Sequence, residues 1–126
     1  MQGTYPSSAK RILCIEDDKD TCEMLSFLLS EYDFNFIHDP EKILPLIETE
    51  KFDLYILDNW LPGISGVELC KKIRALDSNV PVIFTSGSSR KKDIEAAFDA
   101  GANKYLVKPY EPEELREIDK ELIYKN

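Results

Sequence analysis

The sequence has 126 residues, of which 24 are acidic and 16 basic, so its formal net charge at pH 7 is −8. A single domain of about 100 to 150 residues accounts for this length, and the negative charge argues against direct binding to nucleic acid because it repels phosphate groups. No apolar run approaches the roughly 18 to 20 residues of a membrane span and no signal peptide opens the chain, so we expect no contact with a membrane.

In chain order, residues 1–9 come first; they are small and polar, and we predict a flexible leader followed by one domain over residues 10–126. Within that domain, short β-branched and aliphatic runs alternate with stretches of helical spacing. The predicted strands are residues 11–15, 34–38, 54–57, 80–85 and 105–107. The predicted helices are residues 21–32, 41–49, 66–76, 93–100 and 113–124.

This alternation predicts an α/β fold. Strands that are apolar throughout and separated by helices are typical of a parallel sheet covered on both faces, here a five-stranded sheet in a three-layer (βα)5 sandwich. One helix carries a local conflict: Pro45 lies inside residues 41–49 and has no N–H for an interior turn. We therefore expect that helix to be kinked or to start late.

The cysteines bear on the cellular setting. Cys14, Cys22 and Cys70 form no CxxC pair and lie among apolar neighbours, so we expect neither a disulfide framework nor a zinc site. A reducing, cytoplasmic setting fits this pattern best.

Reactive side chains follow four of the predicted strands. Ligands of open parallel sheets bind at the carboxyl ends of the strands, so these groups are expected at one edge. A cluster of carboxylates repels itself unless a cation is present, and a small number of oxygen ligands suits Mg²⁺ or Mn²⁺. A hydroxyl and a lysine beside them equip the site to move a phosphoryl group onto a carboxylate. The groups are Glu16-Asp17-Asp18, Asp58, Thr85-Ser86-Gly87 and Lys108-Pro109.

Four segments carry a resemblance to a known family. RILCIEDD, DLYILDNWLPGISGVEL, VPVIFTSG and GANKYLVKPY occur in order, with Ser86 28 residues after Asp58 and Lys108 22 residues after Ser86. Over residues 11–124 the chain is similar to the receiver domain of two-component response regulators, which has the flavodoxin-like fold of the chemotaxis response regulator. Each segment alone is weak evidence, and the four together at family-like spacing are strong evidence.

The resemblance implies a role for each matching residue. Asp58 would be the phospho-acceptor, and Ser86 and Lys108 would contact the phosphoryl oxygens. The resemblance prefers Ser86 to the adjacent Thr85, since the family's hydroxyl lies five residues after the proline of the strand. Mg²⁺ would be held by Asp17 and Asp58 directly, by Glu16 through water, and by the backbone carbonyl of Trp60. Tyr105 would be the aromatic switch that moves with Ser86 on phosphorylation.

The expected function is a phosphorylation-dependent switch in a phosphorelay. The donor would be a phosphohistidine of a sensor histidine kinase or a histidine phosphotransfer protein, and the output a downstream protein bound through the face near Tyr105. The chain would catalyse only its own phosphorylation and dephosphorylation, so we do not expect a separate turnover substrate. The motifs suit a stand-alone regulator and a receiver within a longer protein equally well.

Two alternatives stay open. A pseudo-receiver would keep the fold as a phosphorylation-independent interaction module; its hallmark is loss of the acceptor, an acidic ligand or the lysine, and none is lost here.

The basic run at residues 90–92 and the acidic segment 111–121 form either solvated faces or a docking surface beside Tyr105. A flavodoxin is a weak rival, because the acidic residues 16–18 would repel its flavin phosphate.

Overall fold

The computed structural model describes residues 9–124, so the predicted flexible leader lies outside the described residues except for Ala9. Helices and strands alternate along the chain as the sequence pattern predicts. The strands of the main sheet are β1 (Arg11–Ile15), β2 (Asp33–Ile37), β3 (Leu54–Asp58), β6 (Val82–Ser86) and β7 (Lys104–Val107). The helices are α1 (Lys19–Leu28), α2 (Pro40–Thr49), α3 (Gly66–Leu76), α4 (Lys91–Ala100) and α5 (Pro112–Ile123).

The main sheet is fully parallel, with strand order β2-β1-β3-β6-β7. The chain moves outward from β1 to β2 and then crosses back to β3, so the direction of winding reverses between β1 and β3. Open α/β sheets bind ligands beside this reversal, at the carboxyl ends of the strands. The predicted fold class is confirmed.

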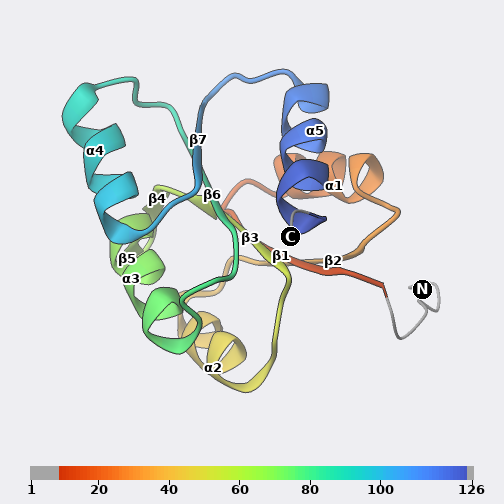
Figure 1. Ribbon diagram of the computed structural model, residues 1–126, viewed down its shortest axis with the longest axis horizontal. Helices are drawn as coiled ribbons and strands as arrows, with labels where there is room; N and C mark the ends of the chain where they lie inside the picture. Colours follow the sequence, from red (N-terminus) through yellow and green to blue (C-terminus); the bar gives the residue numbers. More distant parts are fainter. Residues whose placement is uncertain (1–8, 125–126) are drawn as a thin grey trace.

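Helices cover both faces of the sheet. Figure 1 shows α1 and α5 on one face and α2, α3 and α4 on the other. Successive residues of a strand point to opposite faces, and β1 divides its side chains accordingly: Ile12 and Cys14 pack beneath α1 and α5, whereas Leu13 and Ile15 pack beneath the other three helices. The resulting two cores hold the strand ends at fixed positions. No helix in residues 9–124 combines the length and apolar character that crossing a bilayer requires.

Several element boundaries differ from the prediction, among them the following three. Helix α1 begins at Lys19, two residues earlier than expected, because the Asp18 carboxylate accepts a hydrogen bond from the Thr21 N–H and caps the helix. Helix α2 begins at Pro40, so the expected late start is wrong: proline needs no N–H partner at the first position of a helix, and Pro45 lies inside the helix rather than before it. Strand β6 begins at Val82 rather than residue 80.

A second, two-stranded sheet was missed. Strands β4 (Trp60–Leu61) and β5 (Ile64–Ser65) form a short antiparallel hairpin directly after β3. Gly63 lies in its turn with a φ of 82°, a backbone conformation that side chains other than glycine rarely adopt. This hairpin fixes the path of the chain beside Asp58.

Candidate functional site

Residues from the ends of β1, β3 and β7 meet at the carboxyl edge of the sheet. The Lys108 ammonium lies 2.9 Å from a carboxylate oxygen of Glu16 and 3.6 Å from one of Asp58. Strand β7 is separated from β1 by β3 and β6, so the lysine side chain extends across the sheet edge to reach Glu16. The sequence placed these three residues at one edge, but it did not predict the Lys108–Glu16 pair, because no local pattern reports a contact between residues so far apart.

Glu16 is almost completely buried, at 3% exposure, and each of its carboxylate oxygens has a partner. One oxygen accepts hydrogen bonds from the backbone N–H groups of Asp17 and Asp18, at 3.0 and 3.1 Å, while the other pairs with Lys108. These bonds tighten the loop between β1 and α1. The side chain of Asp17 is exposed at this loop, where it remains accessible to a cation from solution.

Asp58 ends β3 and is also buried, at 8% exposure. Burial and, after it, the nearby negative charge of Glu16 raise the pKa of its carboxyl to about 6, while Lys108 opposes both effects. The Trp60 N–H donates a hydrogen bond of 3.3 Å to this carboxylate. Asp58 is therefore ionised at neutral pH, in a site where negative charge is only partly compensated.

The two candidate hydroxyls at the end of β6 have different partners. The Thr85 hydroxyl donates to the backbone carbonyl of Leu57, at 3.5 Å, whereas the Ser86 hydroxyl oxygen accepts from the Ser88 N–H at 3.1 Å. Both side chains are buried. Because the Ser88 N–H occupies an acceptor position, the hydroxyl hydrogen of Ser86 is left available for donation.

The side chains of Tyr105 and Trp60 differ in exposure. The Tyr105 ring stacks on Phe84, with 6.3 Å between ring centroids, and its hydroxyl donates to the Ser88 carbonyl at 2.9 Å. Tyr105 thus packs inward, against the loop between β6 and α4. Trp60 is 61% exposed on the β4–β5 hairpin, two residues after Asp58, so its side chain is open to solvent.

The acidic residues fit a hard divalent cation. Among residues 9–124, no group of three or more acidic, cysteine or histidine side chains forms a complete metal site. Mg²⁺ does not need one, since it keeps several waters and binds through one or two carboxylates. The incompletely neutralised charge around Asp58, together with the exposed carboxylate of Asp17, suits such an ion.

Comparison with known proteins gives one consistent family. The family model described as the response regulator receiver domain matches residues 12–119, a range that contains all of the site residues above. The DNA-binding response regulator MtrA of Mycolicibacterium paratuberculosis is 34% identical over 108 residues, which cover 84% of this chain and 48% of that protein. The chain spans about half the length of the curated relatives it matches.

Solved structures agree with the family match. A CheY-like response regulator receiver domain protein from Methanospirillum hungatei superposes with a TM-score of 0.86 at 30% identity, over 92% of this chain and 94% of that one. The receiver domain of the sensor histidine kinase PA1611 from Pseudomonas aeruginosa gives a TM-score of 0.81 at 27% identity, over 92% and 98% of the two chains. The PA1611 structure has a magnesium ion coordinated in its active site cleft.

Proposed function

The chain belongs to the receiver domain family of two-component response regulators, and on this basis we propose that Asp58 accepts a phosphoryl group from a phosphohistidine donor. The donor would be a sensor histidine kinase or a histidine phosphotransfer protein. The observation that carries the proposal is the buried position of Asp58 at the end of β3, beside Glu16 and Lys108. Such receiver domains are signalling modules, and we propose no turnover substrate other than the chain's own aspartyl phosphate.

The residues around Asp58 have complementary tasks in this transfer. An Asp58 oxygen forms the new bond to phosphorus as the bond between phosphorus and the histidine nitrogen breaks. Lys108 is positioned to exchange part of its pairing with Glu16 for an oxygen of the incoming group. Ser86 would donate its free hydroxyl hydrogen to another oxygen. Both donors stabilise negative charge that accumulates during transfer.

The metal set proposed from the family pattern is Asp17 and Asp58 as direct ligands, Glu16 through water, and the carbonyl of Trp60. Mg²⁺ (or Mn²⁺) would supply a positive charge that stabilises the phosphoryl oxygens. The chain's own contribution is to hold the acidic residues in place: two backbone N–H groups and Lys108 orient Glu16, and the hairpin after β3 orients Trp60.

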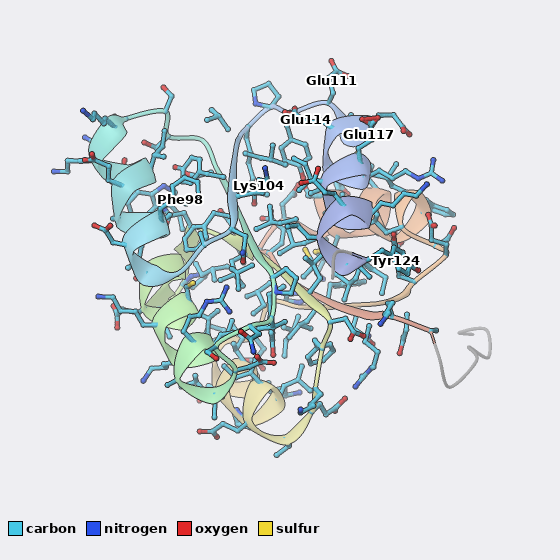
Figure 2. The ribbon with its side chains drawn as sticks, viewed as in Figure 1. Phe98, Lys104, Glu111, Glu114, Glu117 and Tyr124 are labelled. Carbon is cyan, nitrogen blue, oxygen red and sulfur yellow. The ribbon has the colours of Figure 1, made fainter. Side chains whose placement is uncertain are left out.

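The output surface is proposed to lie beside Tyr105. Figure 2 shows Lys104 of β7 between Phe98 of α4 and the glutamates of α5. Phe98, in the last turn of α4, is 45% exposed, and the basic residues at the start of the same helix also face solvent. An apolar side chain flanked by basic and acidic groups suits a protein partner with complementary charge. The glutamates are Glu114 and Glu117 within α5 and its N-cap residue Glu111.

We also propose a cytoplasmic setting. The three cysteine thiols are buried and form no disulfide within residues 9–124, as is usual for proteins of a reducing compartment.

The test uses Trp60, the only tryptophan, as a reporter beside the site. Mg²⁺ should change its fluorescence saturably, and beryllofluoride or acetyl phosphate should then cause a second change. Mass spectrometry should show one added phosphoryl group after acetyl phosphate, and none in Asp58→Asn. A folded protein that responds to neither addition would instead be a pseudo-receiver that binds its partners without phosphorylation.

A further inference from the structure

A hydrogen-bond network links the candidate site to α4 through Ser88. The Ser88 N–H donates to the Ser86 hydroxyl oxygen at 3.1 Å, and the Ser88 carbonyl accepts from the Tyr105 hydroxyl at 2.9 Å. One residue thus contacts both the site hydroxyl and the proposed switch. Any shift of Ser88 must disturb both contacts at once.

The side chain of Ser88 is itself held by α4. Its hydroxyl donates a short hydrogen bond to a carboxylate oxygen of Asp93, in the first turn of that helix. The same carboxylate oxygen accepts from the Arg90 guanidinium at 3.1 Å, and the Arg90 N–H donates to the Ser88 hydroxyl oxygen at 3.2 Å. The Asp93 side chain is only 13% exposed, and the bond from Ser88 lowers the pKa of this carboxyl. Asp93 is therefore ionised and well placed as an anchor.

We propose that Asp93 is a positioning residue, which holds Ser88 so that the Ser86 hydroxyl and the Tyr105 ring are preorganised for the phosphorylated state. The inference rests on the proposed function of Asp58 and deepens it. The effect should be largest for Ser86. The hydrogen bond from the Ser88 N–H already restricts the orientation of the Ser86 hydroxyl, so less rotational freedom is lost when that hydroxyl donates to a phosphoryl oxygen. The anchored Ser88 carbonyl similarly keeps the tyrosine hydroxyl in place.

The test compares binding of two probes to the purified protein, with Trp60 fluorescence as the readout. Asp93→Ala should weaken beryllofluoride binding at saturating Mg²⁺ by about tenfold, the effect of losing one charge-assisted hydrogen bond. Affinity for Mg²⁺ alone should not change, because the proposed metal ligands lie in the loop after β1, at the end of β3 and on the hairpin. A variant that loses both affinities equally would show a general structural defect and overturn the proposal.

Two further variants distinguish the positioning of Ser88 by Asp93 from a general effect of negative charge at the start of α4. Asp93→Asn keeps an oxygen that accepts from Ser88 and Arg90 but loses the charge, so it should recover part of the beryllofluoride affinity that Asp93→Ala loses. If only the favourable interaction of a negative charge with the start of α4 mattered, Asn would be as harmful as Ala, and the proposal would fail. Glu95→Ala, which removes an exposed charge two residues further along α4, is the matched control and should bind like the unaltered protein.

Ser88→Ala tests the same link from the other side. It removes the hydroxyl but keeps the backbone N–H and carbonyl, so it should reproduce the loss seen in Asp93→Ala. The double variant should be little worse than either single one, since both remove the same hydrogen bond between the Ser88 hydroxyl and Asp93. Additive losses would show that the two residues act independently. If the unaltered protein fails to bind beryllofluoride, the proposed function falls; if it binds and the variants match it, only the positioning role falls.

Discussion

At the residue scale, Lys108 balances two buried carboxylates. Lys108→Met keeps much of the apolar stem but leaves Glu16, whose side chain is 4% exposed, without its cation. We expect the free energy of unfolding without Mg²⁺ to fall by about 1–2 kcal/mol, less than for a fully buried pair because the lysine is partly exposed and screened by solvent. Urea titration measures the change.

The same variant should respond more strongly to Mg²⁺ than the unaltered protein, because the positive charge that opposes a second cation has gone. Lys104→Met on the same sheet is the control, since no ion pair of Lys104 occurs among the described residues. If Lys104→Met and Lys108→Met lower the free energy of unfolding equally and are stabilised equally by Mg²⁺, then Lys108 does not balance the charge of the two buried carboxylates.

Hydrolysis of the aspartyl phosphate should be slow, because neither Trp60 nor Ser88 is suited to orient an attacking water. The resemblance to receiver domains implies that the positions two residues after the acceptor and two after the hydroxyl would tune dephosphorylation; in this chain they are Trp60 and Ser88. Neither carries a carboxylate or amide to orient an attacking water, and the Ser88 hydroxyl already donates to Asp93. We expect a phosphoryl lifetime of minutes or longer, measured by the decay of labelled protein. Trp60→Gln should shorten it; a lifetime of seconds in the unaltered protein would contradict this reasoning.

At the element scale, helix α5 contains an unusual buried carboxyl group. Asp119 is 0% exposed, and neither of its carboxylate oxygens has a hydrogen-bond partner within residues 9–124. Burial raises its pKa to about 8. The ordinary value is 3.8, so the folded protein binds a proton that the unfolded chain releases. The free energy of unfolding should therefore fall as pH rises from about 4 to about 8, by at most about 1.4 kcal/mol per unit of pH.

Asp119→Asn should remove that slope, because a neutral amide cannot lose a proton. Glu117→Gln, an exposed position on the same helix, should leave the slope unchanged. The measurement is urea unfolding of all three proteins at several pH values between 4 and 9, with the difference between variant and unaltered protein isolating Asp119 from other titrating groups. Parallel curves for all three would mean that Asp119 does not titrate in this range.

Asp119 also illustrates which features the sequence could predict at the element scale. The acidic segment 111–121 suggested a solvated or docking face, yet Asp119 lies four residues after Leu115 and so falls on the apolar stripe of α5. Runs of aliphatic residues predicted all five strands of the main sheet, because buried strands leave a local pattern. Strands β4 and β5 have two residues each, which is too short for any periodicity.

Long-range contacts explain the rest of what was missed. The carboxyl-end rule brought Asp58, Glu16 and Lys108 to one edge, whereas the pairing of Lys108 with Glu16 joins residues 92 positions apart. The link from Ser88 to Asp93 depends on how the loop after β6 folds back on α4. The roles assigned to Asp17, Ser86, Trp60 and Tyr105 remain predictions that the experiments above test.

At the scale of the whole molecule, the net charge of −8 affects every measurement of stability. Negative charges repel one another across the compact domain, and salt screens that repulsion over a distance of about 10 Å at 0.1 M. NaCl should therefore raise the free energy of unfolding modestly, and the increase should continue gradually with salt concentration rather than level off as it does when a specific site fills. A specific Mg²⁺ site adds a saturable term, which reaches about 2.7 kcal/mol when free Mg²⁺ is 100 times its dissociation constant.

The two effects separate when MgCl2 and NaCl are compared at equal ionic strength. We expect MgCl2 to stabilise the protein more, and Asp17→Asn to abolish that excess while keeping the response to NaCl, because its exposed carboxylate is a proposed ligand with no structural partner to lose within residues 9–124. Asp20→Asn changes the net charge equally in the first turn of α1 and should retain the excess. If Asp20→Asn loses as much as Asp17→Asn, then Mg²⁺ acts on the overall charge of the domain rather than at the carboxyl edge of its sheet.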